Sequence, residues 1–179
     1  MEGEGLFPGL GLRHLATHPD ERGVFSEVFR REWSVGLDPV QWNIVRTEPG
    51  VLRGVHVHPG HADYLVVVEG TATVGLRDLR KDSSTEGGSL TIQLHGKKLT
   101  GLTIPPGVAH GFLFHTRSTH IYSVDRYWGL DDEFGCHWAD PALEIDWPFA
   151  PSSTSPRDAA AGPLSELLAR LEPFQPIGR

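Results

Sequence analysis

The chain has 179 residues, of which 39% are hydrophobic and 22% are charged, so it is long enough for one domain with a sizeable core. Its formal net charge of −7 argues against a surface that neutralises a nucleic-acid backbone. Because no apolar run approaches the roughly 20 residues that span a bilayer and the first residues do not resemble a secretory leader, we expect a cytoplasmic protein with no membrane or nucleic-acid partner.

Short β-rich segments follow one another along the chain, separated by Gly and Pro at intervals of about 8–12 residues, as in an all-β sandwich or barrel. In chain order, the predicted strands lie within residues 40–47, 51–58, 63–79, 89–96, 98–106, 111–116 and 120–128. The third segment breaks at Glu69 and Gly70, which predicts a hairpin. Its apolar first half predicts a strand that is buried on both faces.

The C-terminal part has a different pattern. Residues 149–162 are rich in Pro, Ser and Ala and are typical of a linker. After them, four leucines with the spacing of one helix face predict a short amphipathic helix: Leu164, Leu167, Leu168 and Leu171. We therefore expect a single domain over residues 1–179, with a β core at about 20–148 and a C-terminal linker and helix at 149–179.

The stretch RGVHVHPGHADY, residues 53–64, places three histidines and an aspartate in a strand that enters a turn. Together with Gly70 it resembles the first motif of the cupin superfamily, in which two histidines one residue apart share a strand face and an acidic residue follows. The segment PPGVAH, residues 105–110, resembles the second cupin motif and adds one more histidine. The resemblance implies a metal-ligand set of His56, His58, Asp63 and His110, with Asp in place of the usual Glu.

Three imidazoles and a carboxylate suit divalent Fe, Mn, Ni, Co or Zn, so the residues do not select one metal. The alternative is that His58 and His61 are solvated turn residues that bind no metal.

Six ordered segments, from about Asp20 to the C-terminal helix, resemble the dTDP-4-dehydrorhamnose 3,5-epimerase family, which is itself a branch of the cupins. They read DERGVFSEVF, QWNIVRTEPGVLRGVH, GTATVGLRDLRKDSST, TIPPGVAHGF, HIYSVDRYW and DPALEIDWP. The resemblance implies a cupin jelly-roll sandwich that forms a homodimer and acts on a nucleotide-linked 4-keto-6-deoxyhexose in deoxysugar biosynthesis. Typical members use neither a metal nor an organic cofactor.

Catalysis in that family is proton abstraction alpha to a ketone, which needs a base, a group that stabilises the enolate, and an acid on the opposite face. The resemblance places the base on His56, its orienting carboxylate on Asp158 and a substrate-binding arginine on Arg53. The other substrate contacts that it implies are Arg22, Phe25, Glu27, Gln41, Asn43, His110 and Trp128, of which the first three would come from a neighbouring subunit.

Two positions depart from the family pattern. Asp63 stands where the family has the lysine that stabilises the enolate, and Trp128 stands where it has the tyrosine that acts as acid. A divalent cation held by the four predicted ligands would replace the lysine as a Lewis acid. Asp158 would then orient a ligand histidine, and Tyr122 or His120 would be the base.

Without a metal, His56 and Asp158 remain the catalytic pair and Asp63 is a polar lid residue. Water or Tyr122 could then reprotonate one face in a single epimerisation. Two classes of function stay open: a sugar-nucleotide epimerase or isomerase, and a metal-dependent cupin enzyme, such as an oxygenase, lyase or cyclase, on the same scaffold. A catalytically inactive binding protein is disfavoured, because both members of the catalytic pair are present.

Overall fold

The structure, a computed structural model, describes residues 6–127, 129 and 132–174. β-strands dominate these residues. They are β1 (Gly11–His14), β2 (Thr17–Asp20), β3 (Gly23–Ser26), β4 (Gln41–Thr47), β5 (Leu52–Val57), β6 (Asp63–Glu69), β7 (Thr71–Asp78), β8 (Ser89–His95), β9 (Thr100–Ile104), β10 (Val108–Phe114), β11 (Ser118–Val124) and β12 (Phe134–Gly135). The helices are α1 (Pro156–Ala159) and α2 (Leu164–Leu171), with short 3-10 turns at Arg31–Trp33, Pro141–Leu143 and Glu172–Phe174.

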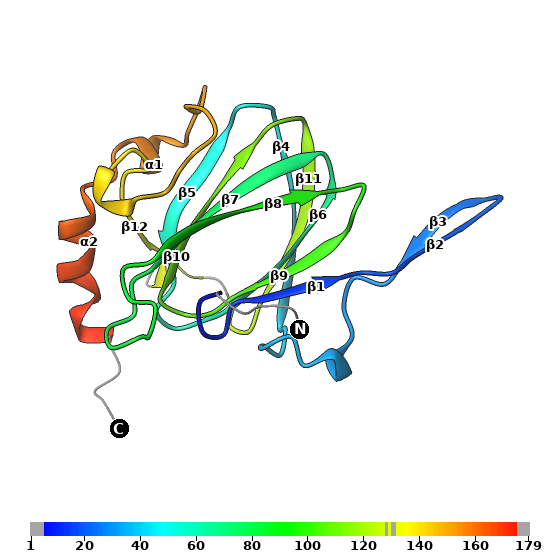
Figure 1. The fold of residues 1–179 in the computed structure, drawn as a ribbon, viewed down its shortest axis with the longest axis horizontal. Coiled ribbons are helices and arrows are strands. Elements are labelled where there is room, and N and C mark those ends of the chain that lie inside the picture. Colours follow the sequence, from blue (N-terminus) through cyan, green and yellow to red (C-terminus); the bar gives the residue numbers. More distant parts are fainter. Residues whose placement is uncertain (1–5, 128, 130–131, 175–179) are drawn as a thin grey trace.

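Two five-stranded antiparallel sheets face each other and form a β-sandwich (Figure 1). The first sheet has the strand order β1-β9-β6-β11-β4, and the second has the order β12-β5-β10-β7-β8. The predicted all-β jelly-roll sandwich with a short C-terminal helix is therefore confirmed. The division into a core at 20–148 and a C-terminal linker stays a prediction.

The hairpin predicted at Glu69 and Gly70 is wrong, although the chain does break there. Strand β6 pairs with β9 and β11, whereas β7 pairs with β8 and β10, so Gly70 turns the chain from one sheet into the other. Gly70 has a φ of +81°, and a Cβ atom there would lie 2.5 Å from the carbonyl oxygen of Arg117. The turn therefore requires glycine, and the apolar run before it is buried as predicted.

An apolar core lies between the two sheets. Alternate residues of β7, Val74 and Leu76, are fully buried against Leu65 and neighbouring strands. Leu65 belongs to this core, Phe112 packs against it, and both also line a cavity between the sheets. The core thus forms the floor of a space that is otherwise lined largely by polar side chains.

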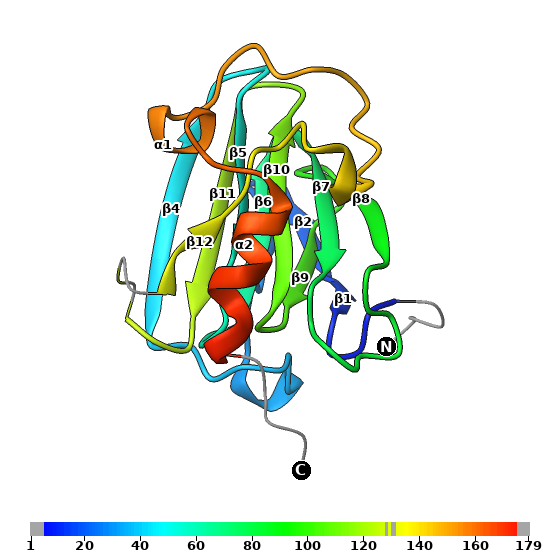
Figure 2. The same cartoon turned by 90° about the vertical axis from the view of Figure 1, so that its left-hand side faces the viewer.

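The C-terminal segment covers the outer face of the second sheet (Figure 2). Helix α2 buries Leu164, Leu167 and Leu171 there, while Leu168 is 42% exposed. The stretch predicted as a linker contains α1, whose first turn is capped by the Ser155 hydroxyl. Among the described residues, no helix is long and apolar enough to cross a membrane.

Strands β2 and β3 form a separate two-stranded ribbon that projects away from the sandwich (Figure 1). Val24 and Phe25 are 68% and 63% exposed on it. The outer face of edge strand β4 is also apolar and exposed, with Trp42 and Ile44 at 43% and 57%. Apolar side chains that are exposed together in this way are typical of surfaces that contact another protein.

Candidate active site

A cavity of about 270 Å³ opens between the two sheets, and both sheets supply side chains to it. The first sheet contributes Val45, Asp63, Leu65, His120, Tyr122 and Val124. The second sheet contributes Arg53, His56, His110 and Phe112. Residues outside the strands complete the lining: His58, His61, Glu133 and Arg157.

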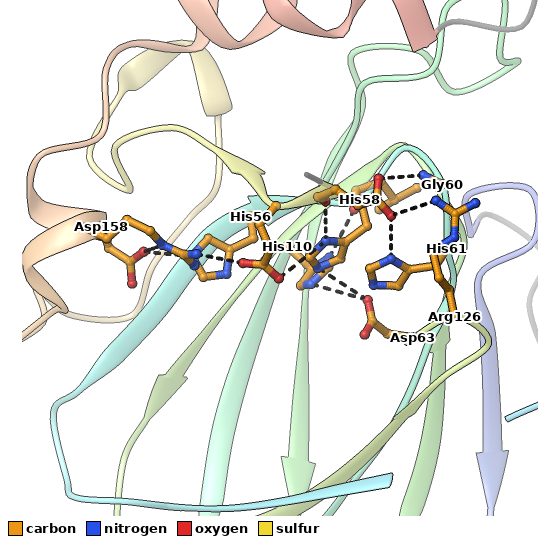
Figure 3. Close-up of polar contacts among 12 residues, drawn as sticks. His56, His58, Gly60, His61, Asp63, His110, Arg126 and Asp158 are labelled. Atoms are coloured by element: carbon orange, nitrogen blue, oxygen red, sulfur yellow. Dashed lines mark hydrogen bonds and ion pairs between the residues drawn. The ribbon is translucent and has the colours of Figure 1, made fainter. Parts of the chain in front are cut away.

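A histidine and an aspartate that are far apart in the sequence meet at the wall of this cavity (Figure 3). Nε2 of His56, on β5, lies 2.7 Å from Oδ1 of Asp158, on α1. Oδ2 of Asp158 accepts a hydrogen bond from the backbone N–H of Gly54 at 3.3 Å. Burial by itself would raise the pKa of Asp158, but these hydrogen bonds outweigh it and lower the pKa. The ionised carboxylate can only accept, so Nε2 of His56 carries its proton and Nδ1 keeps a lone pair.

Gly54 brings β5 and β10 close together at this point. Its φ is +115°, and a Cβ atom there would lie 2.7 Å from the carbonyl oxygen of His110 and 2.8 Å from Cα of Gly111. Those are backbone atoms of the paired strand, so no other residue fits without moving it. The close approach places His56 opposite His110 in the strand register.

Arg157, directly before Asp158, adds a positive charge beside His56. Its Nη2 lies 2.8 Å from Nε2 of His56, and its Nη1 lies 2.9 Å from a carboxylate oxygen of Glu133. Because Nε2 gives its proton to Asp158, it cannot also accept from Arg157 in this tautomer, and the guanidinium is held instead by Glu133 and lies 3.7 Å from Asp158. The cavity wall thus carries a guanidinium whose charge is balanced by two carboxylates.

Three further histidines lie around Asp63, and they are more buried than His56 (Figure 3). Nε2 of His58 and Nε2 of His110 each lie 3.7 Å from Oδ2 of Asp63. Ligand-type atoms of His58, His61 and Asp63 all lie within 4.8 Å of one another. The ring centroid of His58 is 4.2 Å from that of His61 and 5.2 Å from that of His110. The site thus contains a buried His/His/Asp group of a kind that can hold a metal.

Two of the four predicted metal ligands, His58 and Asp63, belong to this group, and a third, His110, lies 3.7 Å from Asp63. His56 points its Nε2 at Asp158 instead. The alternative that His58 and His61 are solvated turn residues is wrong, because they are only 6% and 4% exposed.

Burial changes the pKa of several groups in the cavity. It raises the pKa of Asp63 to about 6, although the nearby His58 acts in the opposite direction. It lowers the pKa of His110 well below the ordinary histidine value and that of His120 to about 4. It also raises the pKa of Tyr122, as does the charge of Asp63. His120 is therefore a poor base, whereas Tyr122 keeps its phenolic proton at neutral pH.

Some of the predicted substrate contacts lie at the cavity. Arg53 and His110 line it directly. Gln41 and Asn43 are hydrogen-bonded to each other at 2.9 Å on β4. They alternate with the exposed side chains of that strand, on the same face as Val45, which lines the cavity.

Other predicted contacts do not line the cavity of their own chain. Arg22 lies at the turn of the β2–β3 ribbon and pairs with Asp20 at 2.5 Å. Phe25 is on the same ribbon, and Glu27, just after it, pairs with Arg30. Trp128 lies outside the described residues.

Four residues of the site were not predicted as members of it: His61, Asp132, Glu133 and Arg157. Oδ2 of Asp132 lies 2.6 Å from Nδ1 of His61, its carbonyl oxygen lies 3.1 Å from Nδ1 of His58, and its Oδ1 accepts from the N–H of Gly60 at 3.0 Å. The signals in the sequence were the acidic run DDEF at residues 131–134 and the arginine directly before Asp158.

Comparison with known proteins agrees with this geometry. Residues 6–166 match the family dTDP-4-dehydrorhamnose 3,5-epimerase. The enzyme of that name from Mycobacterium tuberculosis is 33% identical over an alignment of 174 residues that covers 90% of this chain and 86% of that protein. One similar solved structure is RmlC from Legionella pneumophila, a dTDP-6-deoxy-D-glucose-3,5-epimerase in complex with dTDP-4-keto-L-rhamnose. It is 32% identical and has a TM-score of 0.84, and the match covers 91% of this chain and 92% of that chain.

A second solved structure is a double mutant of ChmJ, a 3'-monoepimerase from Streptomyces bikiniensis, in complex with dTDP. It is 29% identical, with a TM-score of 0.84 and coverage of 97% of this chain and 90% of that chain. The predicted family and the predicted class of enzyme are confirmed by these matches: the chain belongs to the dTDP-4-dehydrorhamnose 3,5-epimerase family.

Proposed function

We propose that the protein epimerises a dTDP-linked 4-keto-6-deoxyhexose, with His56 as the base that removes a proton alpha to the ketone. The observation that carries this proposal is the contact of 2.7 Å between His56 and Asp158 at the wall of a cavity in an epimerase fold. Asp158 holds the imidazole in the tautomer with a free Nδ1, and it stabilises the imidazolium that forms when Nδ1 takes the proton.

The acid is Tyr122. His56 lies on β5 of the second sheet, and Tyr122 lies on β11 of the first sheet, so they line the cavity from facing walls. Inversion at a carbon requires that a proton leave one face and that another arrive at the opposite face. A phenol whose pKa is raised is protonated at neutral pH and can supply that proton, directly or through water.

We propose a single epimerisation rather than a double one. Asp63 and Trp128 replace the lysine and the tyrosine that the family resemblance led us to expect, so part of the usual machinery is missing. ChmJ, a related protein, is described as a 3'-monoepimerase. We therefore expect inversion at C3 only.

The nucleotide is bound by arginines at the rim. Arg53 lines the cavity and is exposed, and its Nε donates to the Thr47 hydroxyl at 3.1 Å, which orients the guanidinium. Arg22 would come from a second subunit, because it does not line the cavity and lies on a ribbon that projects away from the sandwich (Figure 1). Guanidinium groups bind diphosphate oxygens in bidentate geometry.

We propose a homodimer in which the β2–β3 ribbon reaches the cavity of the partner. The exposed Phe25 on the ribbon and the exposed apolar face of β4 support this arrangement. Pairing would also cover β4, which is an edge strand of the first sheet. We further propose that the chain acts as one domain in the cytoplasm.

The test uses dTDP-4-keto-6-deoxyglucose in deuterated water, followed by proton NMR. We expect one deuteron to enter at C3, together with a change of configuration at that carbon. Incorporation at both C3 and C5 would show a double epimerase. A bound substrate without any exchange would reject the epimerase proposal.

A second candidate function is a metal-dependent enzyme on the same scaffold, such as an oxygenase, lyase or cyclase. The buried group of His58, His61 and Asp63 favours it, because imidazole and carboxylate are ligands of redox-active and Lewis-acidic metals alike. Consumption of oxygen by the iron-loaded protein in the presence of the sugar nucleotide, without deuterium exchange, would favour this candidate over the epimerase.

A further inference from the structure

The proposed epimerisation uses His56, Asp158 and Tyr122 but leaves a buried cluster in the same cavity without a role. This cluster consists of His58, His61, His110 and Asp63, and we name it the histidine cluster. All four residues are at most 7% exposed. Burying four ionisable groups together costs free energy unless they are paired or bind an ion.

The hydrogen bonds around the cluster fix the tautomer of each histidine. Nδ1 of His58 lies 3.1 Å from the carbonyl oxygen of Asp132, and Nδ1 of His110 lies 3.1 Å from the carbonyl oxygen of Val108. Nδ1 of His61 lies 2.6 Å from the carboxylate of Asp132. Each of these oxygens can only accept, so each Nδ1 is the donor. In the neutral imidazole, Nε2 then carries a lone pair.

These lone pairs lie around a carboxylate. Nε2 of His58 and Nε2 of His110 are each 3.7 Å from Oδ2 of Asp63, which is too long for a hydrogen bond. Neutral imidazoles of this tautomer offer Asp63 no proton from Nε2. Electron-rich atoms that face one another are stabilised by a cation between them.

The distances suit a transition-metal ion. Ligand atoms of a tetrahedral ion with bonds of about 2.0–2.1 Å lie about 3.4 Å apart. The separations of up to 4.8 Å among His58, His61 and Asp63 are close to this spacing, and His110, which lies 3.7 Å from Asp63 but is not one of those three, would have to move toward them. Hydrogen bonds from Nδ1 to backbone carbonyls and a carboxylate are also the usual second layer around ligand histidines.

We infer that the histidine cluster binds one divalent transition-metal ion through Nε2 of His58, His61 and His110 and through the carboxylate of Asp63. Three imidazoles and one carboxylate favour Zn, Co, Ni or Fe over Mg or Ca. In this ligand set His61 replaces His56, which the sequence motif had predicted as a metal ligand. The ion and the base are then separate, because His56 keeps its hydrogen bond to Asp158.

The role of the ion in the reaction, unlike its binding, rests on the proposed epimerase function. Asp63 stands where the family resemblance places the enolate-stabilising lysine, and it lines the cavity with His56. When His56 takes the proton, the C–H electron pair moves into the enolate and the charge collects on the former ketone oxygen. Held by these four residues, the ion would supply Lewis-acid stabilisation by taking that oxygen as a fifth ligand, and the carbon would be reprotonated from the opposite face without any change in oxidation state.

The test begins with binding alone. The protein is stripped with a chelator, dialysed and titrated with Co²⁺, and the visible absorption of the bound ion is recorded together with calorimetry. We expect one equivalent per chain and an absorption typical of mixed nitrogen and oxygen ligands. A protein that takes up no Co²⁺ and no Zn²⁺ overturns the inference, whatever its activity.

Two matched variants decide the ligand set. His61→Gln should weaken Co²⁺ binding by at least about 10–100-fold, whereas His56→Gln should leave the stoichiometry and the spectrum unchanged. His95→Gln, at the end of β8 and outside the cavity, is the control for removal of a histidine. Circular dichroism shows that each variant is folded. Loss of binding in His56→Gln with retention in His61→Gln would overturn the assignment.

The same preparations separate this inference from the proposed function. Deuterium exchange in a protein that binds no metal would reject the metal site and leave the epimerase standing. A protein that binds one equivalent through His61 but exchanges no deuterium into the sugar nucleotide would reject the epimerase and leave the metal site standing.

Discussion

Nε2 of His56 lies 2.7 Å from Oδ1 of Asp158, although 102 residues separate the two in the sequence. Strand β5 carries the histidine and the short helix α1 carries the aspartate. The contact also depends on the close approach of β5 to β10 at Gly54. The backbone N–H of Gly54 also donates to Asp158. The base and its orienting carboxylate are thus held by the backbone as well as by each other.

The first prediction concerns Asp158→Asn. The amide keeps the shape of the side chain but removes the charge that stabilises a protonated His56, so the rate of deuterium exchange should fall about 10²–10⁴-fold. Calorimetric binding of dTDP should stay unchanged, because Asp158 does not need to touch the nucleotide. An exchange rate close to that of the unmodified protein would mean that His56 is not the base.

The second prediction concerns Arg53→Ala. Loss of a guanidinium that binds a diphosphate oxygen should weaken dTDP binding by ~1.5–3 kcal/mol, the range for a hydrogen bond to a charged group. Calorimetry measures the effect. Arg22→Ala should have a similar effect if the ribbon reaches the partner cavity, and Arg31→Ala, at an exposed arginine paired with Asp38, is the control. Equal affinities for all four proteins would contradict the assignment of the nucleotide site.

The sequence predicted most of the fold because the relevant signals are local. Short β-rich segments between Gly and Pro located strands β4 to β11, and the leucine spacing located α2, whereas β1, β2, β3 and β12 were not predicted. The turn at Gly70 was mistaken for a hairpin, because a glycine turn looks the same whether the next strand joins the same sheet or the facing one. Only the strand pairing, which depends on distant residues, separates these cases.

The site was predictable only where a motif repeats a known pattern. His56 and Asp158 were found in this way. His61 and Asp132, 71 residues apart, had no such pattern, and nothing in the sequence shows that the Asp132 carboxylate meets an imidazole. One alternative left open by the sequence was that His61 is solvated, yet the turn folds inward and buries the residue. Spacing along a strand indicates which face a residue takes, but the direction of a turn is set by its tertiary contacts.

The third prediction concerns the proposed dimer. Ile44→Asp would place a charge in an apolar contact between β4 and the partner and should weaken the dimer by ~1–3 kcal/mol. Light scattering at low micromolar concentration should then show monomer. Leu168→Asp is the matched control, because Leu168 is a similarly exposed aliphatic residue on α2, which covers the second sheet. A monomeric mass for the unmodified protein would reject the dimer.

The fourth prediction concerns stability at Asp78, away from the cavity. Its fully buried carboxylate accepts hydrogen bonds from Arg80, Ser83 and Thr85 at 2.6–2.8 Å. Burial alone would raise the pKa of Asp78, but these bonds outweigh it and hold the pKa well below the usual range. Asp78→Asn should lower the free energy of unfolding at pH 7 by about 3 kcal/mol, because Arg80 loses its charged partner.

The sign of the pH effect follows from that lowered pKa. A carboxylate with a lower pKa in the folded state stabilises the protein above the unfolded value of about 3.9 and loses this contribution as the pH falls below it. The difference between the unmodified protein and Asp78→Asn should therefore be largest near neutral pH and shrink below about pH 4. Urea unfolding at neutral pH and below about pH 4 measures this difference in the free energy of unfolding. Asp38→Asn, at an exposed carboxylate, should change little at either pH.

The last prediction concerns Asp63, because a metal site and a metal-free site demand opposite results there. In a metal site, Asp63→Lys puts an ammonium group among His58, His61 and His110 and expels the ion, so both Co²⁺ binding and deuterium exchange should be lost. In a metal-free site, the lysine would supply the enolate-stabilising cation that the family resemblance places here, and exchange should rise.

Asp63→Ala completes the comparison, because it leaves the three imidazoles without adding a charge. We expect lower occupancy and lower exchange in Asp63→Ala, partly restored by added divalent metal, since three ligands still bind the ion weakly. We also expect a chelator to stop exchange in the unmodified protein and added Co²⁺ or Zn²⁺ to restore it. Exchange that survives the chelator and increases in Asp63→Lys would instead leave the chemistry to His56 and Asp158, with Asp63 as a buried carboxylate that hinders the enolate.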